Sequence, residues 1–223
     1  GHEELLGDRR TAIPSRPCHV IVLDGAAETG RVGIWLDTAG RTPEDTVEEI
    51  LARTVPTRSP LVVADYDERW PAYFEQLARP VHEALADLGA EVEHVGSTSV
   101  PGLAAKPIVD IDVVVGASED VPRAIERLRS LGYVYQGDKG IEGREAFMWP
   151  PGARRHHLYV VVRGSPPHVA HVEFRDYLRG HPDRAREYGA LKKELAERHA
   201  DDSLAYGEAK TEFVIGVLRA ARG

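Results

Sequence analysis

The chain has 223 residues, a formal net charge of −8 at pH 7, 42% hydrophobic and 29% charged residues, which is the composition of a soluble globular protein. No apolar run approaches the roughly 20 residues of a membrane-spanning helix, and the first residues lack the order of a secretory signal. The single cysteine excludes an internal disulfide and a cysteine-based zinc cluster. We therefore expect a cytoplasmic protein with no membrane partner.

The charge is unevenly distributed along the chain. Residues 1–120 contain 10 Lys and Arg against 22 Asp and Glu, whereas residues 121–223 contain 18 against 14. This pattern is compatible with a metal centre in one half and phosphate-binding side chains in the other; scattered surface charge is the alternative. The negative net charge argues against a protein that binds nucleic acid non-specifically along its length, so nucleic acid as a partner is unsupported at this stage.

Residues 1–57 are predicted to form a strand–strand–helix segment. Two β-branched runs predict strands over 18–24 and 32–37. Thr42, a good N-cap, followed by a proline and two acids, predicts a helix from there to about residue 53.

The segment over residues 15–55 weakly resembles the last strands and the final helix of P-loop small-molecule kinases. The chain contains no G-x-x-x-x-G-K-[ST] phosphate loop, so kinase activity cannot reside in it as it stands. We interpret the segment as a kinase remnant or as a piece of a larger kinase domain, joined by a linker at 55–60.

Residues 58–223 are predicted to form an α+β domain, with a mixed β-sheet flanked by helices and a C-terminal helical layer. Apolar residues at helical spacing predict a helix from Trp70 to Gly89 and another over 120–131. The tail from Arg175 is also helical, with helices beginning at Pro182 and at about Ser203. The predicted strands are 61–65, 91–95, 107–115, 133–135, 146–149, 156–162 and 168–174.

Two aspartates interrupt the apolar strand PIVDIDVVV (107–115). Because side chains alternate across a strand, Asp110 and Asp112 point to one face, about 7 Å apart. Two carboxylates so placed are unfavourable unless a cation lies between them. Mg²⁺, which prefers carboxylate, water and phosphate oxygens, would satisfy the pair; a structural salt bridge to Lys or Arg is the alternative.

The turn before this strand is suited to binding phosphate. Gly96 allows the backbone to approach an anion, and Ser97 and Thr98 supply hydroxyl groups. If Ser99 to Leu103 begin a helical turn, their free N–H groups point to the same place. A phosphate cradle followed by paired carboxylates is the arrangement of a nucleotidyl-transfer site.

The stretch HVGSTSVPGLAAKPIVDIDVVV (94–115) resembles the GrpB family, whose members look like polymerase-β-type nucleotidyltransferases. The resemblance covers residues 60–220 and includes DYDERWPAYFEQL, RRHHLYVV, FRDYLRGHPDRAREYGALKKELA and AYGEAKTEFV. It implies a nucleotidyltransferase-like fold and a signature formed by Gly96, Ser97, Asp110 and Asp112. It further singles out recurring positions at Lys106, His157, Arg175, Asp176, Tyr188, Lys192, Tyr206 and Lys210.

Several of these positions can be read in two ways. Lys106 could reach a phosphate or hold Asp110, and His157 could bind phosphate, act as a base or be structural. Arg175 and Lys210 are the better phosphate candidates. Tyr188 and Tyr206 are expected in the core rather than as a base-stacking platform.

A third carboxylate is needed by active polymerase-β-like enzymes, and strand alternation favours Glu173. A solvent-facing Glu173 is the alternative, and Asp176 could instead be the salt-bridge partner of Arg175. The leading hypothesis is Mg²⁺- or Mn²⁺-dependent transfer from a nucleoside triphosphate to an unidentified acceptor. The alternatives are a non-catalytic nucleotide-binding module beside a dephospho-CoA kinase-like domain, and a folding accessory domain.

Overall fold

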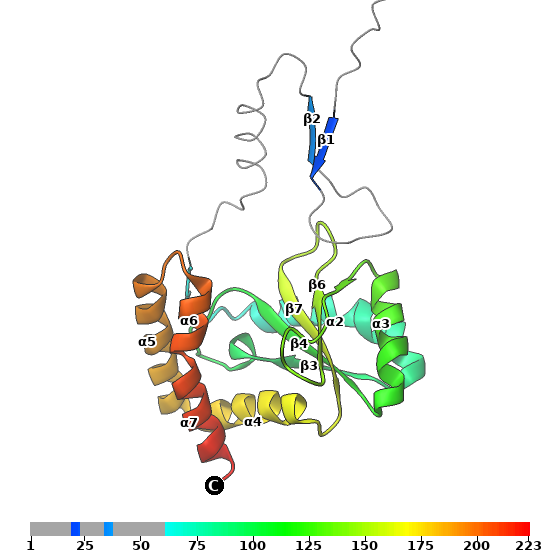
Figure 1. Ribbon diagram of the computed structural model, residues 1–223. Coiled ribbons are helices and arrows are strands. Elements are labelled where there is room, and N and C mark those ends of the chain that lie inside the picture. Colours follow the sequence, from blue (N-terminus) through cyan, green and yellow to red (C-terminus); the bar gives the residue numbers. More distant parts are fainter. Residues whose placement is uncertain (1–18, 23–33, 38–60) are drawn as a thin grey trace, which may run out of the picture. The chain divides into compact units, whose positions relative to one another are not determined.

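The computed structural model describes residues 19–22, 34–37 and 61–223 (Figure 1). The chain divides into two compact units, residues 1–59 and 60–223. In the first unit, strands β1 (His19–Val22) and β2 (Ile34–Asp37) pair antiparallel, which confirms the two predicted strands. The helix predicted from Thr42 lies outside the described residues, and the kinase-remnant interpretation stays a prediction.

The second unit is built on a five-stranded mixed sheet, so the predicted α+β class is confirmed. The strand order is β3-β4-β7-β6-β5; β4 and β7 are parallel, and the other neighbours are antiparallel. The strands are β3 (Glu91–Val95), β4 (Val109–Val115), β5 (Val134–Tyr135), β6 (Arg144–Met148) and β7 (His156–Val162).

One face of the sheet carries the main hydrophobic core. Helices α2 (Trp70–Leu85) and α3 (Val121–Ser130) cover this face. Leu85 and Leu128, one from each helix, are fully buried against Ile111 of β4 and Val160 of β7. Alternation along β4 therefore turns Asp110 and Asp112 to the opposite face, as the sequence predicts.

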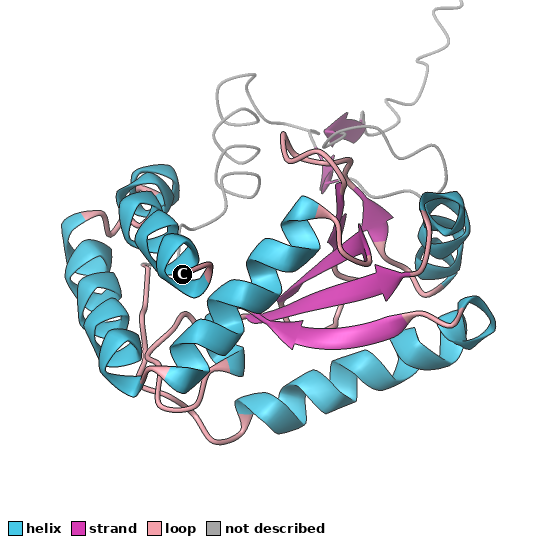
Figure 2. Cartoon of the chain, turned by 90° about the horizontal axis from the view of Figure 1, so that it is seen from below, coloured by secondary structure: helices cyan, strands magenta, loops and turns pink. Residues whose placement is uncertain are grey.

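The opposite face is covered by the first of the C-terminal helices, and the C-terminal helices together form the predicted helical layer. Helix α4 (Pro166–Gly180) lies across the strands (Figure 2), and α5 (Pro182–Arg198), α6 (Ser203–Ala209) and α7 (Thr211–Ala221) gather beside the sheet (Figure 1). Phe174, Tyr188 and Phe213 form part of the apolar contact between these helices. Within the described residues, no helix is long and apolar enough to span a bilayer.

Two of the predicted strands are wrong. Residues 168–174 belong to α4, because Ser165 takes the extended N-cap conformation and two prolines occupy the first helical turn, a position that suits proline. Residues 61–65 form only an isolated bridge, in which Ala64 and Ala105 exchange both backbone hydrogen bonds at 2.9 Å. The bridge still fixes residues 61–65 against the approach to β4.

Candidate functional site

Gly96 and Asp110 are in close contact at the end of the sheet where β3 finishes. Gly96 has φ +69°, and a Cβ atom placed on it would lie 2.3 Å from Oδ2 of Asp110. Only glycine adopts this backbone without strain and leaves room for the carboxylate. The predicted turn and the first aspartate therefore share one site, although their binding of phosphate and metal stays a prediction.

The hydroxyl groups of this turn are partly used inside the protein. The Oγ–H of Ser99 donates to the carbonyl of Gly96 at 2.6 Å, and Oγ1 of Thr98 lies 3.0 Å from Nε2 of His94. Both side chains are buried, and residues 97–99 form a single 3-10 turn. Ser97 is half-buried, and its hydroxyl group has no hydrogen-bond partner among the described residues, so it is available to a ligand.

Asp110 also contacts a histidine from the neighbouring parallel strand. The β4–β7 register places His157 directly beside Asp110, and Nδ1–H of His157 donates to Oδ1 of Asp110 at 2.7 Å. Both side chains are partly exposed. His157 thus touches the carboxylate, and its outer ring nitrogen remains available for a ligand.

Asp112 lies deeper than Asp110. Its side chain is 0% exposed, and its Oδ2 accepts a 2.8 Å hydrogen bond from Nδ1 of His171 on α4. Its Oδ1 is buried and has no hydrogen-bond partner in the described part of the chain. Burial raises the pKa of this carboxyl group, while His171 acts in the opposite direction. A buried carboxylate oxygen without a partner is costly, so this oxygen would gain from a cation.

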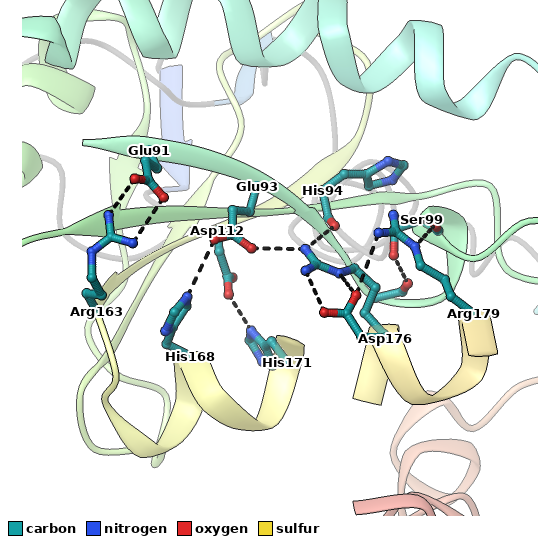
Figure 3. Close-up of polar contacts among 12 residues, drawn as sticks. Glu91, Glu93, His94, Ser99, Asp112, Arg163, His168, His171, Asp176 and Arg179 are labelled. Atoms are coloured by element: carbon teal, nitrogen blue, oxygen red, sulfur yellow. Dashed lines mark hydrogen bonds and ion pairs between the residues drawn. The ribbon is translucent and has the colours of Figure 1, made fainter. Parts of the chain in front are cut away.

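A carboxylate that the sequence analysis overlooked lies beside Asp112. Glu93 of β3 is directly opposite Asp112 in the antiparallel register (Figure 3) and accepts a 2.9 Å hydrogen bond from Arg175 of α4. His168 of α4 lies 3.6 Å from the same carboxylate. These contacts fasten α4 to the sheet through polar side chains.

Two predicted site residues are corrected by these contacts. Arg175 is bonded to Glu93 and, in a bidentate pair, to Asp176 at 2.7 and 3.1 Å, so its guanidinium is neutralised and not free for phosphate. Glu173 lies on a helix rather than a strand, and its carboxylate accepts a 2.7 Å bond from Arg222. We therefore leave Arg175 and Glu173 out of the site. The predicted alternative, that Asp176 pairs with Arg175, is confirmed.

Three lysines form a cluster around two tyrosine rings. The Nζ atoms of Lys106 and Lys210 lie 4.2 and 4.3 Å from the ring centroid of Tyr206, and Nζ of Lys192 lies 4.4 Å from that of Tyr188. Within residues 61–223, none of these ammonium groups has a carboxylate at ion-pair distance. Tyrosine faces stabilise cations only modestly, so the cluster retains excess positive charge.

Burial lowers the pKa of each lysine in this cluster, and repulsion by Lys210 lowers it further for Lys106 and Lys192. Burial is the largest cause in all three. The pKa of Lys106 falls to about 8, with further lowering by Lys210 and Arg155, and that of Lys192 falls to about 7, with further lowering by Lys210. Asp110 acts against the shift in each case, so the cluster lies within electrostatic range of the aspartate.

Lys192 is the most unusual member of the cluster. Its side chain is 2% exposed, and its Nζ has no hydrogen-bond partner among the described residues. A buried ammonium in this condition destabilises the protein unless an anion approaches it. An anion of several charges placed between the lysines and the Gly96 turn would relieve this cost.

His168 and His171, which the sequence analysis did not single out, could have been found with the correct helix assignment. His168, His171 and Arg175 are spaced by three and four positions, so they share one face of a helix. Read as a strand, the same stretch places His168 and His171 on opposite faces. Helical periodicity over 166–180 was therefore the available signal for the α4 contacts.

The comparisons with known proteins agree on the second unit. A family model described as GrpB protein matches residues 60–220. The UPF0157 protein YqkA of Bacillus subtilis is 37% identical over 149 residues, which is 67% of this chain and 43% of that protein. The matched part thus spans less than half the length of this relative. The crystal structure of the conserved protein GrpB from Enterococcus faecalis superposes with a TM-score of 0.65 and 36% identity, covering 72% of this chain and 96% of that one.

A further similarity extends beyond the family segment. The dephospho-CoA kinase of Mycolicibacterium paratuberculosis is 25% identical over 227 aligned positions, covering 84% of this chain and 56% of that protein. Because 84% of the chain is longer than residues 60–220, this similarity also includes residues of the first unit.

Proposed function

The chain belongs to the GrpB family, and from the geometry of its site we propose that it transfers a nucleoside monophosphate from a nucleoside triphosphate to an acceptor. The observation that carries the proposal is the cluster of Lys106, Lys192 and Lys210, which lacks carboxylate partners in the described structure and lies within electrostatic range of Asp110. A triphosphate is the anion of sufficient charge to engage all three lysines and the Gly96 turn together.

The carboxylates fit Mg²⁺ or Mn²⁺ as the accompanying ion. Asp110 and Asp112 share one face of β4, and the buried Oδ1 of Asp112 lacks a partner in the described residues. Mg²⁺ needs only one or two carboxylates when phosphate and water oxygens complete its shell. Among the described residues, no three His, Cys, Asp or Glu side chains form a metal-binding group, so the substrate phosphates would have to complete this one.

The proposed reaction is an in-line displacement at the α-phosphorus. An acceptor oxygen forms a bond to that phosphorus, the bond to the β-phosphate oxygen breaks, pyrophosphate leaves, and the acceptor proton passes to solvent. A bound divalent ion would polarise the α-phosphate and lower the pKa of the acceptor hydroxyl. The lysines hold the β- and γ-phosphates and offset the charge that develops on pyrophosphate. Gly96 and Ser97 orient the triphosphate against Asp110.

A second candidate function is nucleotide binding without transfer, in a module that accompanies a kinase-like domain. Two observations favour it. Each aspartate is already bonded to a histidine, His157 or His171, and Glu93, the carboxylate beside Asp112, is bonded to Arg175. This chain is also similar to a dephospho-CoA kinase, and a kinase domain of that kind is the one that such a module would accompany.

Label transfer distinguishes the two candidates. The protein is incubated with Mg²⁺ or Mn²⁺ and each of ATP, GTP, CTP and UTP labelled at the α-phosphate, in the presence of a metabolite extract, and labelled products are separated. We expect a labelled product together with released pyrophosphate, and its loss in Asp110→Asn. The matched control is Asp138→Asn, a substitution at an exposed loop carboxylate that bonds Gly140.

Binding of a nucleotide with no labelled product from any acceptor would favour the second candidate. A product that forms equally in wild type and Asp110→Asn would contradict the proposed role of the carboxylates.

A further inference from the structure

Two exposed arginines stack on aromatic rings beside the start of β7. The guanidinium carbon of Arg154 lies 3.8 Å from the ring centroid of Tyr73, and that of Arg155 lies 5.5 Å from the ring of Trp149. We call these four residues the arginine rim. In the described structure, neither guanidinium forms an ion pair with a carboxylate. Asp67, which lies in electrostatic range of Arg154, is already bonded to Arg69.

The arginine rim lies at the same end of the sheet as the proposed site. Arg154 and Arg155 directly precede β7, and the parallel register pairs His156 with Val109 and His157 with Asp110. The chain before β7 and the chain before β4, which carries Lys106, therefore meet at one edge of the sheet. Arg155 is close enough to Lys106 to contribute to its lowered pKa, after burial and Lys210.

A second connection brings Tyr73 to this edge. Ala64 and Ala105 exchange two backbone hydrogen bonds of 2.9 Å, which hold the segment entering α2 against the residue before Lys106. Tyr73 lies in the first turn of α2. A positively charged path therefore leads from the lysine cluster through Arg155 to Arg154.

We propose that the arginine rim binds a single-stranded oligonucleotide, whose end reaches the lysine cluster and acts as the acceptor of the nucleotidyl group. The arginines supply charge for the phosphodiesters, and their flat guanidinium groups, backed by Tyr73 and Trp149, supply surfaces on which unpaired bases stack. An acidic protein would use the charges but gain nothing from the aromatic rings. A duplex keeps its bases stacked internally and cannot use these surfaces.

The role as acceptor rests on the proposed function, whereas strand binding does not. Strand binding is therefore measured alone, without nucleotide or metal. Fluorescence anisotropy with labelled homopolymers of about 15 nucleotides, in ribose and deoxyribose forms, shows which sugar is preferred. We expect the double variant Arg154→Ala/Arg155→Ala to weaken binding about tenfold, and the single variant Trp149→Ala to do the same. Trp149→Phe, which keeps an aromatic ring, should retain most of the wild-type affinity.

The salt dependence gives an independent readout. Loss of two phosphate contacts should reduce the slope of log affinity against log salt by about 1.4, since each contact to a single strand contributes about 0.7. The matched control is Arg123→Ala/Arg127→Ala, which removes the same charge from the outer surface of α3, where both arginines contact Asp87. We expect the control to leave the slope and the affinity unchanged within about twofold.

Two results would overturn the inference. The first is that the wild type binds neither strand. The second is that polyglutamate displaces the labelled strand as well as an unlabelled strand does, and that Trp149→Ala leaves binding intact. The affinity of the Arg154→Ala/Arg155→Ala variant for Mg²⁺ and ATP is measured as well, because it tests the proposed function independently of strand binding. Retained nucleotide binding with lost strand binding supports the inference and also shows that the variant is folded.

Discussion

At the scale of single residues, the site depends on atoms that are buried without a partner. Oδ1 of Asp112 and Nζ of Lys192 both lack a hydrogen-bond partner among the described residues. Their ionised forms carry opposite charges, and they lie on different elements, β4 and α5. Unpaired groups of this kind cost folding free energy, and a bound metal–triphosphate complex would offset both costs together.

The contact between Gly96 and Asp110 predicts a stability loss that depends on position. Gly96→Ala places a Cβ 2.3 Å from Oδ2 of Asp110 at a φ of +69°, so we expect the free energy of unfolding to fall by about 3 kcal/mol. Gly102→Ala is the matched control, because its φ is +77° but nothing lies within 4 Å of the added Cβ. It should cost only about 1 kcal/mol. Urea unfolding of both variants measures the difference, and equal losses would show that the carboxylate is not held against the glycine.

Lys192 predicts a pH-dependent stability. Its pKa is lowered from 10.5 to about 7, first by burial and then by Lys210, with Asp110 opposing. A lowered pKa in the folded state contributes stability that is present above the unfolded value and is lost as pH falls through about 7. Lys192→Met removes this loss, so at about pH 6 the variant should be more stable than wild type, by on the order of 2 kcal/mol.

Urea unfolding across the pH range, without nucleotide, measures this effect. The advantage of Lys192→Met should shrink as the pH approaches about 10. Lys193→Met, a substitution of the exposed neighbour that pairs with Asp65, should show no such trend. An advantage of Lys192→Met that is independent of pH would mean that the pKa of Lys192 is the same in the folded and in the unfolded protein.

At the scale of elements, α4 marks where sequence reasoning succeeds and where it fails. Strands β3 and β4 were predicted within two residues, because their β-branched residues and alternation report local structure directly. The stretch HVAHVEF has similar β propensity, yet its proline N-terminus and packing against the sheet make it helical. Local preference was overridden there by the two prolines at the start of the helix and by tertiary contact.

Charge patterns alone could not separate ligand-binding residues from structural ones. Arg175 stands on α4 and Lys210 lies between α6 and α7, and the two were equal phosphate candidates. Arg175 meets Glu93, a residue 82 positions earlier, while Lys210 meets the ring of Tyr206. Only the fold reveals which cation has a carboxylate beside it.

Arg175 should therefore stabilise the α4–sheet contact without binding phosphate. Arg175→Ala removes the hydrogen bonds that Arg175 donates to Glu93 and Asp176, and we expect a loss of about 2 kcal/mol in the free energy of unfolding. Affinity for Mg²⁺ and ATP should stay within about twofold of wild type. Lys106→Ala is the comparison, with weaker nucleotide binding and little change in stability. If Arg175→Ala abolishes nucleotide binding while remaining folded, Arg175 belongs to the nucleotide site.

At the scale of the whole molecule, the two compact units separate at Ser59 and Pro60. Every residue of the proposed site lies in the second unit, which also contains the whole five-stranded sheet. A unit with its own core is expected to fold alone. Residues 60–223 expressed without the first unit should thus unfold cooperatively and bind Mg²⁺ and ATP within about twofold of the full chain. A fragment that binds nucleotide much more weakly, yet unfolds cooperatively, would place part of the site in residues 1–59.

The most direct test of the central claim is calorimetric titration of Mg²⁺ and nucleoside triphosphate into wild type, Asp110→Asn, and the double variant Lys106→Ala/Lys210→Ala. Lys139→Ala/Lys193→Ala, which removes one exposed and one half-exposed lysine, is the charge-matched control. We predict that the lysine variant loses at least about tenfold in affinity with or without metal, that Asp110→Asn loses only the metal-dependent part, and that the control binds like wild type. Equal affinities for all four proteins would contradict the claim that these lysines and Asp110 form one triphosphate site.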